Sequence, residues 1–307
     1  MAPDIEHSEQ KTVQANGIEI VYDTFGDPKS PPLILIMGLG RQMIDWDEAF
    51  CKKIAGHGLR VIRFDNRDVG LSTHFNDAGA PDLSAVFQAF MKGEKPQVAY
   101  TLIDMAKDVT GLMDALNIKS AHIAGASMGG MIAQTICIHF PQRVKTLISI
   151  MSTTGNPDLP RATPEAAAVL ATPSPSERKA NIEHSLKVAR IINGTFPVDE
   201  QRVRKMAALA FDRMYNPAGF LRQYTSILTS GSRKDQLASI KIPTLVIHGT
   251  QDPLIPKEAG ADTARTIPGA KLCLIEGMGH SFPLEVWDEV IHQMVSHAKN
   301  IEEANNR

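Results

Sequence analysis

Six short apolar runs constrain the fold of this 307-residue chain more than any other feature of its sequence. They read "LILIM", "RVIRF", "AHIAG", "TLISIM", "TLVIHG" and "LCLIEG", and they begin at residues 33, 60, 121, 146, 244 and 272. Uninterrupted apolar runs of this length are typical of strands buried on both faces of a parallel sheet, and helical patterns separate them. The sequence therefore predicts an α/β fold, with a mostly parallel central sheet and helices on both of its faces.

Two local patterns support this interpretation. Residues 11–26 alternate in polarity around Asn16-Gly17, the pair that two-residue hairpin turns prefer, so two antiparallel strands are expected there. Residues 101–116 carry apolar side chains three and four positions apart, which predicts one amphipathic helix. Thr101 and Asp104 are expected to cap its first turn.

The alternation of strands and helices stops between residues 155 and 240. This stretch contains four helical patterns separated by Pro and Gly turns, at residues 163–171, 176–193, 198–215 and 218–228. We therefore expect one α/β core domain made from residues 1–154 and 241–307, with an α-helical cap, or lid, formed by residues 155–240 inserted between its halves.

Composition excludes several classes of function. The formal net charge is −2 and no Lys/Arg cluster is visible, which argues against a nucleic-acid partner. No apolar stretch approaches the length of a membrane span, and the N-terminus lacks the pattern of a targeting peptide, so a cytoplasmic protein is expected. The three cysteines are far apart and are expected to be reduced core residues, with no zinc site.

A serine flanked by glycines follows the third apolar run. In "GASMGG", Ser127 lies between Gly125 and Gly129 in a G-x-S-x-G pattern, after a predicted strand and before a predicted helix. Such a turn holds the serine in a strained backbone conformation and presents its hydroxyl at the edge of the sheet. A Gly-rich turn with a purely structural role is the alternative, but the strand and helix on either side favour a nucleophile.

A serine hydroxyl needs a base, and the base needs a third group to orient it. Asp252 and His280 follow the last two apolar runs, so both are expected at the same edge of the sheet as Ser127. Asp252 precedes a proline, and a turn-forming role is its alternative. His122 and His248 lie inside predicted strands and are expected to be structural.

The order Ser, Asp, His and the motif at Ser127 resemble those of α/β-hydrolase-fold serine hydrolases, over about residues 11–298. Within that superfamily the chain is similar to esterases and lipases with a helical cap. The run "FDNRDVGLS" resembles the family's D-x-R-G-x-G-x-S loop, with Asp68 where glycine is usual. The loop "MGLGRQ" has Met37-Gly38 where most capped relatives have His-Gly.

The resemblance implies further site residues. The backbone N–H groups of Leu39 and Met128 are expected to form the oxyanion hole. Gly38, Met37 and Met43 are expected to contribute to the substrate pocket. No metal and no organic cofactor is implied, and the oligomeric state is left open.

The function expected from these residues is hydrolysis of small to medium apolar carboxylic esters through an acyl-enzyme. Hydrolysis of lactones or of carbon–carbon bonds, or acyl transfer, is the alternative on the same three residues. A ligand receptor that keeps a slow hydrolase frame is the non-enzymatic alternative. A dinucleotide site at "ILIMGLGRQM" is disfavoured, because Met43 occupies the place of the third glycine in G-x-G-x-x-G.

Overall fold

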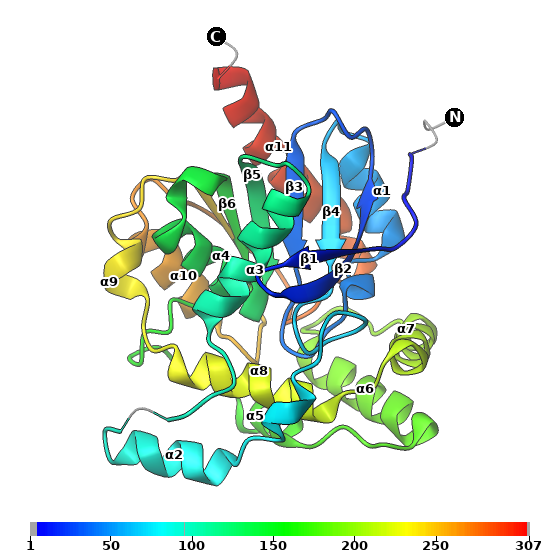
Figure 1. The fold of residues 1–307 in the computed structure, drawn as a ribbon, viewed down its shortest axis with the longest axis vertical. Helices are drawn as coiled ribbons and strands as arrows, with labels where there is room; N and C mark the ends of the chain where they lie inside the picture. Colours follow the sequence, from blue (N-terminus) through cyan, green and yellow to red (C-terminus); the bar gives the residue numbers. More distant parts are fainter. Residues whose placement is uncertain (1–4, 95, 306–307) are drawn as a thin grey trace.

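The computed structural model describes residues 5–94 and 96–305, which form one eight-stranded sheet flanked by helices (Figure 1). The strands lie in the order β1-β2-β4-β3-β5-β6-β7-β8. Only the β1–β2 and β2–β4 pairs are antiparallel. The predicted α/β fold with a mostly parallel sheet is therefore confirmed. The strands are β1 (Lys11–Ala15), β2 (Ile18–Phe25), β3 (Pro32–Ile36), β4 (Arg60–Phe64), β5 (Ala121–Ala126), β6 (Val144–Ile150), β7 (Thr244–Gly249) and β8 (Lys271–Ile275).

The first two strands form the predicted hairpin. Asn16 and Gly17 connect them, and both have positive φ, 51° and 78°. Positive φ at both central residues is the conformation that a two-residue hairpin turn of type I′ requires, and asparagine and glycine adopt it most readily.

Helices cover both faces of the sheet. On one face α3 (Leu102–Ala115), α4 (Met128–His139) and α10 (Lys257–Thr266) pack, and on the other α1 (Glu48–Ala55) and α11 (Trp287–Asn305). The predicted helix cap is present, because the Thr101 side chain accepts from the Asp104 N–H while the Asp104 carboxylate accepts from the Thr101 N–H. Among the described residues, no helix is long and apolar enough to cross a membrane.

A group of helices interrupts the α/β alternation between β6 and β7, as predicted. Figure 1 shows most of these inserted helices together at one end of the strands, whereas the last and shortest of them lies apart, beside α10. They are α5 (Pro164–Ala171), α6 (Arg178–Ile192), α7 (Glu200–Arg213), α8 (Pro217–Thr229) and the short α9 (Lys234–Leu237). A further helix, α2 (Leu83–Met91), lies in a segment for which the sequence analysis made no prediction.

One strand differs from its prediction. The run at residue 272 was expected to be buried on both faces, but β8 is the last strand of the sheet and pairs with β7 alone. Leu272 and Leu274 are 40% and 45% exposed. Both are apolar, so the sequence pattern of β8 matches that of an interior strand although its position is at the edge.

Two of the three cysteines lie in the core. Cys51 and Cys137 are buried, and burial raises the pKa of both thiols. Cys273, on β8, is only half-buried, so the prediction of a core position is wrong for this residue. All three are free thiols.

His122 on β5 is a buried histidine, as predicted from its place in a strand, and it makes stability depend on pH. Its ring is fully buried, with Nδ1 2.9 Å from Thr146 Oγ1 and Nε2 3.0 Å from Glu302 Oε1 on α11. Burial lowers the pKa of His122 to about 4, against the opposing effect of the Glu302 carboxylate.

We therefore expect acid to destabilise the fold through His122. Between about pH 6.5 and pH 4 the unfolded chain binds a proton at this residue and the folded chain does not, so the free energy of unfolding falls by up to about 3 kcal/mol as the pH decreases. Above that range both states are neutral, and the residue contributes no pH dependence. Urea titrations at pH 7.5, 6, 5 and 4 should show a smaller loss for His122→Gln than for the wild type. Equal losses in the two proteins would contradict the assignment, and the exposed His57→Gln is the control.

Candidate active site

Ser127 occupies a sharp turn between β5 and α4. Its φ of 55° and ψ of −120° lie outside the regions that most residues adopt, which is the strained geometry expected for a serine presented on such a turn. The Ser127 N–H donates to the Ile150 carbonyl at the end of the neighbouring strand β6, at 2.9 Å. The turn is therefore tied to the sheet on the side opposite its exposed hydroxyl.

The glycines around Ser127 are required by backbone contacts. A Cβ atom on Gly125 would lie 2.0 Å from the Gly129 carbonyl oxygen, and one on Gly129 would lie 2.1 Å from the Ile36 carbonyl oxygen. No Cβ atom tolerates such distances, so α4 can approach β3 and β5 this closely only with glycine at both positions. The G-x-S-x-G spacing follows from packing as well as from the strained turn.

The structure brings the three side chains predicted from the sequence into one hydrogen-bonded row. His280 Nε2 lies 3.0 Å from Ser127 Oγ, and His280 Nδ1 lies 2.7 Å from Asp252 Oδ2. Asp252 follows β7 and His280 follows β8, so the loops at the carboxyl ends of three parallel strands meet here. Both distances are within hydrogen-bonding range.

The Asp252 carboxylate is buried, and both of its oxygens have hydrogen-bond partners. Its Oδ1 accepts from the backbone N–H groups of Leu254 and Ile255, each at 2.9 Å, and its Oδ2 faces His280. Burial alone would raise the pKa of Asp252, but the neighbouring His280 and His248 hold it well below its usual range. The carboxylate is therefore ionised, and an ionised Oδ2 assigns the proton of the His280 ring to Nδ1.

His248 supports Asp252 from within β7. Its Nε2 lies 2.8 Å from the Ile255 carbonyl oxygen and 3.5 Å from Asp252 Oδ2, and the ring is fully buried. In the described part of the chain, no hydrogen bond joins His248 to Ser127. This agrees with the predicted structural role beside the site.

The loop after β3 makes a tight turn against Ser127. The Arg41 N–H donates to the Gly38 carbonyl at 3.2 Å, and Gly40 has a φ of 66°, which together are the features of a type II turn with Leu39 and Gly40 at its centre. A Cβ atom on Gly38 would lie only 3.2 Å from Ser127 Cβ. Gly40 thus supplies the left-handed conformation, and Gly38 allows the close approach to the serine.

One backbone N–H at this turn and one at the start of α4 have no hydrogen-bond acceptor among the described residues. In residues 5–94 and 96–305, neither the Leu39 N–H nor the Met128 N–H has a hydrogen-bond acceptor. The Met128 N–H also belongs to the first turn of α4, where helical N–H groups carry partial positive charge. These are the two groups that the sequence analysis assigned to an oxyanion hole.

The methionines assigned to the pocket lie deep in the structure. Met37 is 6% exposed and packs in the core on the α1 and α11 face, and its carbonyl accepts from the Asn66 side chain at 3.0 Å. Met43 is fully buried among Val21, Ile44 and side chains of α7. Their role in substrate binding stays a prediction.

Asp68, which stands where the family usually has glycine, keeps the backbone conformation of glycine. Its φ is 68°, a region that aspartate tolerates better than most residues. Its buried carboxylate accepts from the Tyr100 hydroxyl at 2.6 Å and from two nitrogens of Arg222 on α8 at 2.7 Å. Burial alone would raise the pKa of Asp68, but the hydrogen bonds from Arg222, Tyr100 and the Phe75 N–H lower it. The aspartate therefore docks α8 on the loop after β4.

The loop that carries His280 is bonded to the end of α6. The His280 N–H donates to the Ile192 carbonyl at 2.6 Å, and the Gly279 N–H donates to the Asn193 carbonyl at 3.2 Å. A Cβ atom on Gly279 would lie 2.1 Å from the Ile192 carbonyl oxygen, so the two backbones touch. The inserted helices thus contact both the His280 loop and, through α8, the loop after β4.

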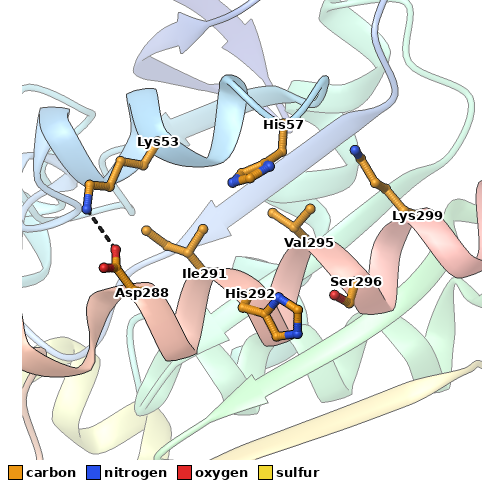
Figure 2. A pocket seen from close by; sticks show the side chains of 8 residues that line it. All are labelled: Lys53, His57, Asp288, Ile291, His292, Val295, Ser296 and Lys299. Atoms are coloured by element: carbon orange, nitrogen blue, oxygen red, sulfur yellow. Dashed lines mark hydrogen bonds and ion pairs between the residues drawn. The ribbon is translucent and has the colours of Figure 1, made fainter. Parts of the chain in front are cut away.

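A groove of about 540 Å³ lies elsewhere, between α1 and α11 (Figure 2). Figure 2 shows Lys53 and Asp288 bridging it, at 2.8 Å, with His57 and His292 on its walls. It shares no residue with the loops that carry Ser127, Asp252 and His280. Within the part of the chain that the structure describes, no group of three or more His, Cys, Asp or Glu side chains has the arrangement of a metal site.

The fold and the site together define the class of protein. Residues 31–285 match the alpha/beta hydrolase fold family. The chain therefore belongs to this family, and it is a hydrolase.

Curated relatives and solved structures span nearly the whole chain. Rhodomycin D methylesterase from Streptomyces sp. strain C5 is 27% identical over an alignment of 311 positions, which covers 94% of this chain and 98% of the relative. 3-Oxoadipate enol-lactonase 2 from Acinetobacter baylyi is 26% identical, with 79% of each chain covered. The 2-hydroxy-6-oxo-6-phenylhexa-2,4-dienoate hydrolase from Rhodococcus sp. strain RHA1 superposes with a TM-score of 0.75 at 19% identity, over 96% of this chain and 100% of that structure. At that identity, the structural likeness supports the shared fold alone.

The sequence analysis missed the polar side chains that support these loops. Asn66 holds the Met37 carbonyl, and Asn193 contributes both its backbone and its side chain beside His280. Asn66 lies within "FDNRDVGLS", so that motif marked its neighbourhood without showing its contact. Nothing in the local pattern around Asn193 marks this role, because its partners on the His280 loop, Gly279 and Ser281, lie more than 80 residues away in the chain.

Proposed function

We propose that the protein hydrolyses carboxylic esters through an acyl-enzyme formed on Ser127. The observation that carries this proposal is the hydrogen-bonded row of Ser127 Oγ, His280 and Asp252 at distances of 3.0 and 2.7 Å. A nucleophile, a base within reach of it and a group that orients the base are the parts that acyl transfer by serine requires.

In the first step His280 Nε2 takes the proton of the Ser127 hydroxyl while Oγ attacks the ester carbonyl carbon. The negative charge that develops on the carbonyl oxygen is stabilised by the N–H groups of Leu39 and Met128, which are free of other acceptors. The imidazolium then gives its proton to the leaving alcohol. In the second step His280 takes a proton from water while the water oxygen attacks the acyl carbon. The imidazolium then gives this proton to Ser127 Oγ as the bond between Oγ and the acyl carbon breaks and the acid leaves.

We further propose that residues 155–240 act as a cap over this site, on a core formed by residues 1–154 and 241–307. The hydrogen bonds from the His280 loop to Ile192 and Asn193 support this division, because they place inserted helices beside the base. Gly38, Met37 and Met43 are the predicted pocket residues of the core, and the apolar surroundings of the two methionines favour an apolar acyl or alcohol group. The partner is thus a small-molecule ester, and the mechanism needs no metal or organic cofactor.

Lactone hydrolysis is the second candidate, because a lactone is a cyclic ester and needs the same catalytic groups. The curated relatives include both a methylesterase and an enol-lactonase, at 27% and 26% identity.

A substrate panel tests the proposal and separates the candidates. We expect p-nitrophenyl esters of short to medium acyl chains to be hydrolysed, with a rate that depends on chain length and a fluorophosphonate probe attached at Ser127. Faster turnover of lactones than of any open-chain ester would favour the second candidate. Failure to hydrolyse either class, together with no labelling at Ser127, would identify a non-catalytic ligand-binding protein instead.

A further inference from the structure

The helix α8 turns polar side chains toward the core. Arg222, Gln223, Thr225 and Ser226 are all at most 2% exposed, although buried helix faces are usually apolar. Arg222 pairs with Asp68, and the Ser226 hydroxyl donates to the Tyr100 carbonyl at 2.7 Å. These contacts fix α8 on the core loops, and they leave the role of Gln223 to be explained.

The Gln223 side chain joins two loops of the core. Its Oε1 accepts from the Gly40 N–H at 2.8 Å, and its Nε2 donates to the Arg67 carbonyl at 2.8 Å. Gly40 belongs to the turn after β3 and Arg67 to the loop after β4, and the amide between them is fully buried. One side chain of an inserted helix therefore bonds the turn that carries the Leu39 N–H.

Each peptide unit of that turn has its own anchor. The Met37 carbonyl accepts a hydrogen bond from the Asn66 side chain, and the Gly38 carbonyl accepts one from the Arg41 N–H. The Gly40 N–H donates to the Gln223 side chain. The Gly38 carbonyl and the Leu39 N–H share one planar trans peptide and point in opposite directions. The orientation of the Leu39 N–H therefore depends on the turn keeping its shape on both sides of Leu39.

Gly40 is the weak point of this turn. Glycine moves between backbone conformations more easily than other residues, and its φ of 66° is held by its surroundings. Phe220 of α8 packs on it so closely that a Cβ atom on Gly40 would lie 2.6 Å from Phe220 Cδ2. Without the Gln223 amide, the half-buried Gly40 N–H and the buried Arg67 carbonyl would both lose this partner, and turning the Leu39–Gly40 peptide would expose the N–H to another one.

We propose that Gln223 is a positioning residue that holds the Leu39 N–H in line with the oxyanion, from a helix outside the α/β core. This inference rests on the proposed function, because it gives the Leu39 N–H a role only in ester or lactone hydrolysis. It assigns to α8 a part in the chemical step as well as in covering the site.

Steady-state kinetics on a p-nitrophenyl ester test the proposal with two variants. Gln223→Met keeps the shape of the side chain and removes both hydrogen bonds, and we expect kcat to fall about 10- to 100-fold with KM within about threefold of wild type. Complete loss of one oxyanion donor typically costs about 100- to 1,000-fold, and a misaligned donor costs less. Gln223→Glu keeps an oxygen for the Gly40 N–H but buries a charge and loses the bond to Arg67, so it should be less stable than Gln223→Met yet retain a higher kcat.

We expect Gln223→Glu to be the less stable variant and also the faster one. This order distinguishes a positioning role from a purely structural role. If Gln223 only stabilised the fold, kcat would follow the melting temperature and Gln223→Glu would be the slower enzyme. Gln134→Met is the matched control, since Gln134 is an equally buried amide that bonds Ser149 and Arg233 and has no contact with the turn. It should lower the melting temperature and leave kcat unchanged.

Two results would overturn the inference: a kcat for Gln223→Met within twofold of the Gln134→Met value, or a rise in KM at unchanged kcat. If Gln223→Met does not fold, the kcat of Gln223→Glu relative to wild type still tests the proposal. A decrease of more than 100-fold in Gln223→Glu would contradict it, because this variant is expected to keep the hydrogen bond to the Gly40 N–H. Wild type and Ser127→Ala are measured in the same assay. Absence of Ser127-dependent turnover would refute the proposed function, whereas Ser127-dependent turnover with unaffected Gln223 variants would refute this inference alone.

Discussion

Replacing Ser127 with alanine should lower kcat for ester hydrolysis by about a millionfold and abolish labelling by a fluorophosphonate. The remaining rate would come from substrate binding and the two N–H groups of Leu39 and Met128. His280→Ala should cost about as much, because a serine without its base is as ineffective as a base without its serine. The double variant should be no slower than either single variant, since the two side chains act as one unit.

These losses are measured from initial rates, with the enzyme concentration taken from the mass of protein. Mass spectrometry of the labelled protein identifies the residue that carries the probe. Ser149→Ala is a suitable control, because Ser149 is a buried serine on the neighbouring strand β6 and its hydroxyl accepts from the Gln134 side chain. It should keep the activity and the labelling of wild type. Additive losses in the Ser127 and His280 variants would show that the two residues do not cooperate, and the acyl-enzyme mechanism would have to be abandoned.

Changing Asp252 to asparagine should lower kcat about 10,000-fold while leaving the fold intact. The contacts of Asp252 give the reason. Its Oδ1 accepts two backbone N–H groups, so the oxygen of an asparagine would stay there and the amide nitrogen would replace Oδ2. His280 Nδ1 would then have to accept, its proton would move to Nε2, and Nε2 could no longer take the proton of Ser127.

The kinetic comparison of Asp252→Asn with Asp262→Asn checks this prediction. Asp262 is also buried, but it bonds Thr154 and Lys234 away from the serine, so its substitution should affect stability and spare kcat. Acid should not act through Asp252 itself, because the pKa of Asp252 is held well below its usual range and the carboxylate stays ionised at pH 4. A loss of less than tenfold in Asp252→Asn would contradict the role of Asp252 in setting the proton position.

Much of the fold and the three residues of the hydrogen-bonded row could be predicted from sequence because their signals are local. An apolar run marks a strand, and the residue just after it lies at the edge of the sheet, so Ser127, Asp252 and His280 fall together without any knowledge of strand order. The order of the strands in the sheet could not be predicted from the sequence. Leu272 and Leu274 match the pattern of an interior strand, and only the topology makes them part of an exposed edge.

The supporting contacts could not be predicted, because each joins segments that are far apart in the chain. Gln223 lies 183 residues from Gly40, and Arg222 lies 154 residues from Asp68. A buried glutamine on a helix has the same local pattern as an exposed one. Asp68 is instructive in the same way: in sequence it departs from the usual glycine, and in space it is the counterion that Arg222 requires.

The place of β7 and β8 in the chain has a consequence for protein synthesis. His280 is the 153rd residue added after Ser127, and all the inserted helices lie in between. At ordinary rates of translation that interval lasts about 8 to 30 s. During that time the emerging chain can form β5, the turn at Ser127 and α4, but the serine has no base to accept its proton. Under the proposed mechanism, a nascent chain is therefore inert toward esters until β8 and the loop that carries His280 have been added to the sheet.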